Sequence, residues 1–266
     1  MARLAPVEHE DRLTLVEHLD ELRSRLIVSL SAVAVAFGLC LWQNKLLLDL
    51  AKNPIPEEHR EFLTFGPAEP FMTTITIAGY GAIVIALPVI IYQIYAYVLP
   101  ALTPDERRVT LPLIMAIPFL FVAGVVFAYF VAVPAALDFL LNFNSSEFNV
   151  ELRARDYLSF FALTLVALGF LFQMPIVILG VTRLGIVSPQ DLAANRRYAV
   201  LAIAVVAMLL PGTDPVTMLL AMVPLIILFE GSLLLAKATG KPSWEDEDEP
   251  APGEPTPGEP TPEPPG

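Results

Sequence analysis

The stretch TTITIAGYGAIVIALPVIIYQIYAYVL, residues 73–99, decides the class of this protein. It contains 27 residues and not one Asp, Glu, Lys or Arg. A helix needs about 20 predominantly apolar residues to cross the hydrocarbon core of a bilayer. The stretch is longer than that, and it therefore predicts a transmembrane helix.

The same pattern recurs along the rest of the chain. The 266 residues are 55% hydrophobic and 17% charged, whereas a soluble domain is about half apolar and about a quarter charged. The sequence therefore predicts an all-α integral membrane protein. Six transmembrane helices are expected, in the apolar blocks Leu26–Trp42, Thr73–Leu99, Thr110–Leu137, Tyr157–Thr182, Tyr198–Leu210 and Val216–Ala236.

The basic residues indicate how these helices are oriented. With the N-terminus inside, the cytoplasmic segments hold eleven Lys and Arg and the outer segments hold five. Cytoplasmic loops are the ones enriched in Lys and Arg, so both termini are expected in the cytoplasm. We predict a cytoplasmic amphipathic helix over 1–25, a six-helix membrane domain over 26–237, and a disordered, acidic, Pro-rich cytoplasmic tail over 238–266.

The start of the chain lacks the features of a secretory signal peptide, because residues 8–21 carry six acids and the first apolar block begins only at Leu26. We therefore expect a multi-pass protein of a bacterial or archaeal cytoplasmic membrane.

Charge and composition exclude several other functions. The net charge is −12, and residues 242–266 contain eight acids and no Lys or Arg, so nucleic acid is not an expected partner. Cys40 is the only cysteine, and the three histidines have no metal-ligand spacing, so no metal site and no cofactor are expected. No phosphate loop, GxSxG or HExxH motif occurs, so no catalytic residue is predicted and the chain is not expected to be an enzyme.

The last two blocks predict an unusual hairpin. Only 13 residues separate Arg197 from Pro211, which is roughly 20 Å of helix at about 1.5 Å per residue. Because the bilayer core is about 30 Å thick, we expect helices five and six to be short and Asp214 to lie toward the apolar zone. The blocks also contain prolines that bend helices and favour a curved bundle: Pro88, Pro112, Pro118, Pro134, Pro175 and Pro224.

Two acidic motifs stand beside the membrane on the predicted cytoplasmic side. In TLVEHLDELRSR, residues 14–25, Thr14 and Glu17 have the spacing of a capping box, and Glu21 can pair with Arg25 one turn later. In LPALTPDERR, residues 99–108, Glu106 can close a second capping box. Beyond these structural roles, Glu21 and Glu106 together are suited to a cationic ligand, and paired guanidinium groups fit best.

Polar residues inside the blocks form a second group of candidates, namely Gln93, Gln173, Asp214 and Glu230. Ionisable groups in a membrane tend to face a cavity or a partner. Asp214 can alternatively cap the sixth helix, and Gln173 can form a hydrogen bond between helices.

Several motifs together resemble the TatC family, the core subunit of the twin-arginine protein translocase. The resemblance runs in order from about residue 12 to residue 237. It is carried by HLDELRSR (18–25), PFMTTI (70–75), PVIIYQIYAYVLPALTPDERR (88–108), FLFQMPIVI (170–178), TDPVTMLL (213–220) and PLIILFE (224–230).

The resemblance implies six transmembrane helices in a curved, concave bundle. It implies a receptor that binds twin-arginine signal peptides of folded cargo. It also implies an oligomeric complex with TatA- and TatB-type single-span proteins in the membrane lipid, which exports that cargo with the proton-motive force. By motif, Glu21 and Glu106 correspond to the acids that bind the arginine pair, and Arg23 and Tyr97 belong to the same surface. Asp214 corresponds to the acid of the last hairpin, whereas Gln173 stands where the family usually has Glu.

A second function uses the intramembrane acids differently. Asp214 and Glu230 are also compatible with a proton-coupled small-solute transporter. The sequence supports this reading less, because the two halves differ in helix length and no inverted repeat is evident.

Overall fold

The computed structural model describes residues 15–98, 104–148, 150–183, 186–211 and 214–238. For 15–18, 98, 104–114 and 183 it describes the backbone and not the side chains. Residues 1–14 lie outside the described residues, and so does the predicted tail 238–266 except Ala238, which ends α10. The helices of the described part are α1 (Leu15–Trp42), α2 (Asn44–Lys52), η1 (Glu57–His59), α3 (Glu69–Val98), α4 (Pro104–Phe127), η3 (Ala128–Ala132), α5 (Val133–Asn142), α6 (Ala154–Leu171), α7 (Met174–Arg183), α8 (Pro189–Ala194), α9 (Arg196–Met208) and α10 (Pro215–Ala238).

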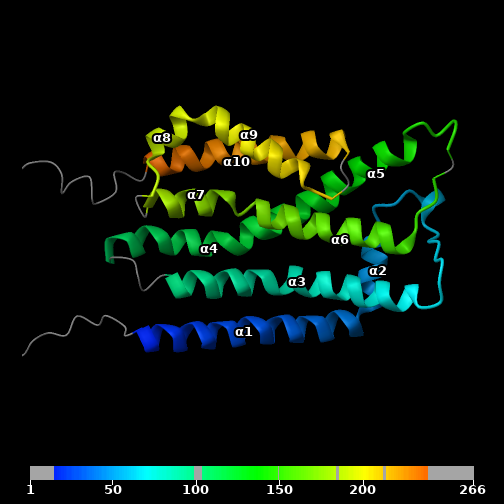
Figure 1. The fold of residues 1–266 in the computed structure, drawn as a ribbon, viewed down its shortest axis with the longest axis horizontal. Helices are drawn as coiled ribbons and strands as arrows, with labels where there is room; N and C mark the ends of the chain where they lie inside the picture. Colours follow the sequence, from blue (N-terminus) through cyan, green and yellow to red (C-terminus); the bar gives the residue numbers. More distant parts are fainter. Residues whose placement is uncertain (1–14, 99–103, 149, 184–185, 212–213, 239–266) are drawn as a thin grey trace, which may run out of the picture.

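The long helices lie side by side along one common direction, and α2 runs across them at one end of the bundle (Figure 1). Within the bundle, α1 packs against α3, α3 packs against α4 and α6, and α10 packs against both α7 and α9. The N-terminus of α1, the C-terminus of α3 and the N-terminus of α4 lie together at one end (Figure 1). We call this the Glu21 end and the opposite one the Trp42 end.

Five helical segments are long and apolar enough to cross a membrane: Leu19–Trp42, Glu69–Tyr97, Met115–Asn142, Ala154–Thr182 and Pro215–Ala238. Large apolar side chains on them point outward, including Val35 at 69% and Phe119 at 74% exposure, as expected of surfaces that face lipid. The predicted all-α, multi-pass membrane protein is therefore confirmed. The first span continues without a break from the acidic segment that begins at Leu15.

The last hairpin differs in part from the prediction. Helix α9 has 13 residues, as short as expected, and it is not among the five spans, so the count of six membrane helices stays a prediction. Helix α10 has 24 residues and is longer than the short helix we expected. It gains length because it begins directly after Asp214 and continues past the apolar block to Ala238.

Small residues let neighbouring helices approach closely. Ala36 of α1 packs against Ala82 and Ala86 of α3. At the crossing of α4 and α6, a Cβ on Gly124 would lie 2.7 Å from the Leu168 carbonyl oxygen, which is backbone and cannot move aside easily. This crossing therefore requires glycine at position 124.

Two of the predicted bends interrupt the membrane helices. A π-helical turn, η3, separates α4 from α5, and Pro134 follows directly in the first turn of α5. Helix α6 ends at Leu171 and α7 begins at Met174, next to Pro175, whose ring removes a backbone donor. Pro88 and Pro224 lie inside α3 and α10 without ending them.

The connections at the Trp42 end are tied together by hydrogen bonds. The Leu63 N–H donates to the Leu152 carbonyl at 3.1 Å, and the Ala154 N–H donates to the Leu63 carbonyl at 3.1 Å. The buried Tyr157 hydroxyl donates to the Ala51 carbonyl at 2.6 Å. These bonds fix α2 and the start of α6 in place.

Candidate functional site

The candidate site at the Glu21 end is built around Arg25. Its Nε donates to Glu21 Oε1 at 3.0 Å, and its Nη1 donates to Gln93 Oε1 of α3 at 3.1 Å. The Glu21 and Arg25 side chains are 25% and 24% exposed, so the pair lies at the edge of the helix packing. Helical spacing on α1 brings Glu21 and Arg25 together, and the packing of α1 on α3 adds Gln93.

This arrangement confirms the predicted Glu21–Arg25 pair, and it adds a partner that the sequence did not indicate. The bonds use Glu21 Oε1, and among the described residues no bond to its Oε2 is present. A carboxylate held on one oxygen can still accept a hydrogen bond from a cationic ligand on the other.

The other predicted residues of this site lie at the same end. Arg23 is exposed on α1, and Tyr97 is partly buried in the last turn of α3. Glu106 belongs to the first turn of α4, whose N-terminus lies at the Glu21 end (Figure 1), but its side chain is outside the described residues. That its carboxylate converges with that of Glu21 stays a prediction.

Gln173 lies at the interruption between α6 and α7. It is buried, and its Nε2 donates to the Ile117 carbonyl of α4 at 3.3 Å. This is the hydrogen bond between helices that the sequence allowed. Its Oε1 is also buried and has no partner in the described part of the chain.

Asp214 caps α10, which is one of the two roles that the sequence predicted for it. Its Oδ1 accepts the Thr217 N–H at 2.7 Å, and the carboxylate is buried, with 4% exposure. Its Oδ2 and the Thr217 hydroxyl have no partner among the described residues. Both residues line a cavity of about 150 Å³ at the tip of the α9–α10 hairpin.

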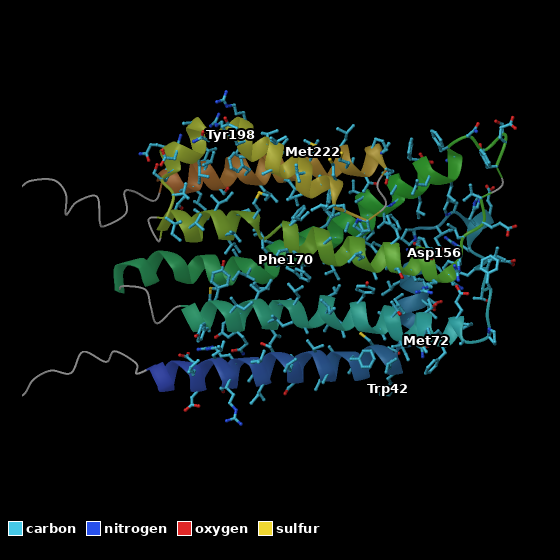
Figure 2. The ribbon with its side chains drawn as sticks, viewed as in Figure 1. Trp42, Met72, Asp156, Phe170, Tyr198 and Met222 are labelled. Carbon is cyan, nitrogen blue, oxygen red and sulfur yellow. The ribbon has the colours of Figure 1, made fainter. Side chains whose placement is uncertain are left out.

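Glu230 has a partner that the sequence did not suggest. Arg196, the first residue of α9, places Nη2 3.1 Å from Glu230 Oε2 on α10. The two side chains are 52% and 39% exposed. Figure 2 marks Tyr198, two residues after Arg196, at the start of α9. Because α9 and α10 run antiparallel, the start of one meets the second half of the other, and only the hairpin geometry reveals the pair.

A further ion pair, also missed from the sequence, joins two helices at the Trp42 end. Arg153 Nε donates to Glu69 Oε1 at 2.7 Å, and Glu69 Oε2 accepts the Phe65 N–H at 2.8 Å. The hydrogen bond to Glu69 raises the pKa of the Arg153 guanidinium above its ordinary value. Such a pair requires the first turns of α3 and α6 to be neighbours, which sequence spacing does not show.

Comparison with known proteins identifies the family. Residues 17–224 match the model of TatC, the Sec-independent protein translocase protein. This chain belongs to the TatC family.

Relatives from chloroplasts and bacteria resemble the TatC-family chain over most of its length. It is 35% identical over 233 residues to the chloroplastic TATC of Arabidopsis thaliana. The aligned region covers 87% of this chain and 68% of that protein. It is 36% identical over 230 residues to TatC of Aquifex aeolicus. The aligned region covers 85% of this chain and 95% of that relative.

A crystal structure of the twin-arginine translocase receptor TatC has the same fold, with a TM-score of 0.71 and 35% identity. The match covers 84% of this chain and 99% of the crystallised one. The TatC-family chain is therefore a core component of a Sec-independent, twin-arginine protein translocase, which works as a complex with other Tat proteins and moves cargo. This is a transport role, and TatC is not a family of enzymes.

Proposed function

We propose that this chain is the signal-peptide receptor of a twin-arginine translocase. It binds the twin-arginine signal peptides of folded cargo at the Glu21 end, which faces the cytoplasm. It then assembles with TatA- and TatB-type single-span proteins for export driven by the proton-motive force. The observation that carries the proposal is the placement of Glu21 with Arg25 and Gln93 at the end where α4 begins with Glu106.

The internal pair is suited to exchange with an incoming guanidinium. A partly exposed ion pair contributes only about 0.2–1 kcal/mol, so a signal-peptide arginine replaces or joins Arg25 on Glu21 at little cost. Gln93 keeps Arg25 at a fixed place while this happens, since its Oε1 accepts from Nη1. The second arginine of the peptide binds Glu106.

The apolar part of a signal peptide needs a surface of its own. A cavity of about 430 Å³ lies between α2, α3, α4, η3 and α6, and apolar side chains such as Ile77, Val84 and Val125 line it. In the proposed complex, the peptide arginines bind at the Glu21 end and the apolar segment follows the wall toward this cavity. Burial of that segment then supplies much of the affinity.

Partner helices require acceptors at membrane depth. Gln173 Oε1 is a buried, unpaired acceptor within the described structure, and a partner helix reaches it only if the helices around it move apart. It forms hydrogen bonds without titrating, so the proposed assembly does not depend on the Glu that the family usually carries at this position.

Binding of a twin-arginine peptide to the purified full-length protein tests the proposal. Glu21→Gln and Glu106→Gln are each expected to weaken binding about threefold to tenfold relative to wild type. Asp20→Asn is the matched control, because Asp20 is an exposed acid one residue away. A peptide with two lysines should bind more weakly than the arginine peptide to the wild type, because lysine cannot form bidentate contacts. Equal binding by all three variants contradicts the proposal.

The transporter alternative is less favoured by the contacts of its two acids. Asp214 caps a helix and Glu230 pairs with Arg196, so each has a structural role. Solute flux in vesicles that is indifferent to signal peptides would favour the transporter instead.

A further inference from the structure

A polar cavity lies at the Trp42 end, and its lining includes none of the residues assigned to signal-peptide binding. Its volume is about 440 Å³, and it opens between the first turns of α3 and α6. Figure 2 marks this region by Met72 on α3 and Asp156 on α6. The polar residues of its lining are Glu69, Thr73, Thr76, Arg153, Arg155 and Ser159.

Thr73 lies in the lining of this cavity and has an unpaired hydroxyl. It is 6% exposed, and its hydroxyl oxygen is buried without a partner in the described part of the chain. The neighbouring Thr74 and Thr76 each donate to the carbonyl four residues earlier, at 2.8 Å, whereas Thr73 does not. A buried hydroxyl without a partner is costly, so a group that accepts its proton is expected in the cavity.

The charges of the lining favour an anion. Arg153 and Arg155 contribute two positive charges. Glu69 of the lining and Asp156 beside it both pair with Arg153, at 2.7 Å and 3.9 Å, so Arg155 is the cation left for an anion. Arg155 is exposed and forms no hydrogen bond or ion pair with another described residue. In addition, α6 begins beside the cavity without a side-chain cap, so its N-terminal dipole also attracts negative charge.

The depth of the cavity favours a lipid as the source of that anion. Two membrane spans begin at its edge, at Glu69 and at Ala154, so it lies at the level of the phospholipid headgroups. Exposed apolar side chains adjoin it, with Phe71 at 64% and Met72 at 58% exposure. Acyl chains can therefore run along α3 while the headgroup occupies the cavity.

We propose that this cavity binds the phosphate group of a membrane phospholipid. Arg155 pairs with the phosphate, and the Thr73 hydroxyl donates a hydrogen bond to it. The bound lipid joins α3 to α6 at the Trp42 end, and the site is independent of the signal-peptide site at the opposite end.

Native mass spectrometry of the purified full-length protein tests this site with three probes. These are dioleoylphosphatidylglycerol, dioleoylglycerol, which has the same chains without phosphate, and inorganic phosphate. We expect phosphatidylglycerol to bind at least tenfold more tightly than dioleoylglycerol. Arg155→Gln and Thr73→Val should each reduce the binding of phosphatidylglycerol severalfold, and Arg155→Lys should restore most of it.

Lys45→Gln is the matched control, because Lys45 is an exposed cation on α2 at the same end and does not line the cavity. The proposal is overturned if Arg155→Gln and Lys45→Gln have equal effects, or if dioleoylglycerol binds as tightly as phosphatidylglycerol. Binding of inorganic phosphate that equals phosphatidylglycerol binding and depends on Arg155 would also overturn the assignment to lipid. Thermal unfolding of each variant verifies that it is folded.

Discussion

Arg25 of α1 donates a hydrogen bond from Nη1 to Gln93 Oε1 of α3 at 3.1 Å, while its Nε holds Glu21 at 3.0 Å. The acid proposed to bind signal peptides is thus connected, through one guanidinium, to the neighbouring membrane helix. Its position therefore depends on the packing of α1 against α3 and not on the start of α1 alone.

Replacement of Gln93 should loosen this connection. Gln93→Leu removes the acceptor for Arg25 and is expected to weaken binding of a twin-arginine peptide about twofold to tenfold, since one hydrogen bond contributes about 0.5–1.5 kcal/mol. Gln93→Glu keeps an acceptor and should bind closer to wild type. A binding titration in detergent measures both variants, and unchanged affinity of Gln93→Leu would show that Gln93 does not position Glu21.

The close crossing of α4 and α6 should not tolerate a side chain. In Gly124→Ala the new Cβ would lie 2.7 Å from a backbone oxygen, so we expect a loss of about 1–3 kcal/mol in stability. Gly38→Ala of α1 is the control, because a Cβ there meets nothing within 4 Å. That variant should be neutral or stabilised by up to about 1 kcal/mol, because alanine favours helix. Thermal unfolding of both variants gives the comparison, and equal stabilities would contradict the close crossing.

The stability of the protein should depend more on the helix cap that Asp214 forms than on the charge of its carboxylate. Asp214→Asn keeps an oxygen for the Thr217 N–H and should remain close to wild type in stability. Asp214→Ala removes the cap and is expected to lower stability by about 1 kcal/mol. If Asp214→Asn unfolds as readily as Asp214→Ala, the charge itself stabilises the hairpin.

The Arg196–Glu230 pair should couple the two helices of the hairpin only weakly. Both side chains are partly exposed, so a double-mutant cycle with Arg196→Gln and Glu230→Gln should give a coupling of about 0.2–1 kcal/mol. The coupling should decrease with added salt, because screening acts on exposed charges. A coupling of zero would mean that the contact does not contribute to stability in solution.

The membrane helices and their interruptions were predictable because they follow from local sequence. Apolar blocks locate the spans, Pro175 locates the break before α7, and the spacing of Glu21 and Arg25 predicts their pair. Gln93–Arg25, Arg196–Glu230 and Arg153–Glu69 were not predictable, because each joins residues far apart in the chain through the packing of helices.

The length of α10 was underestimated for a different reason. We inferred a short hairpin from the 13 residues between Arg197 and Pro211, which limit α9 alone, whereas α10 begins at its cap and continues to Ala238.

Photo-crosslinking of a signal peptide tests most directly whether Glu21 and Glu106 form one site. A photoreactive residue is placed next to the arginine pair of the peptide, and the crosslinked segments of the full-length protein are mapped by mass spectrometry. We predict crosslinks to both the 15–25 segment of α1 and the 104–110 segment of α4, and loss of both with a twin-lysine peptide. Crosslinks confined to the Trp42 end, or to one of the two segments alone, would contradict the account.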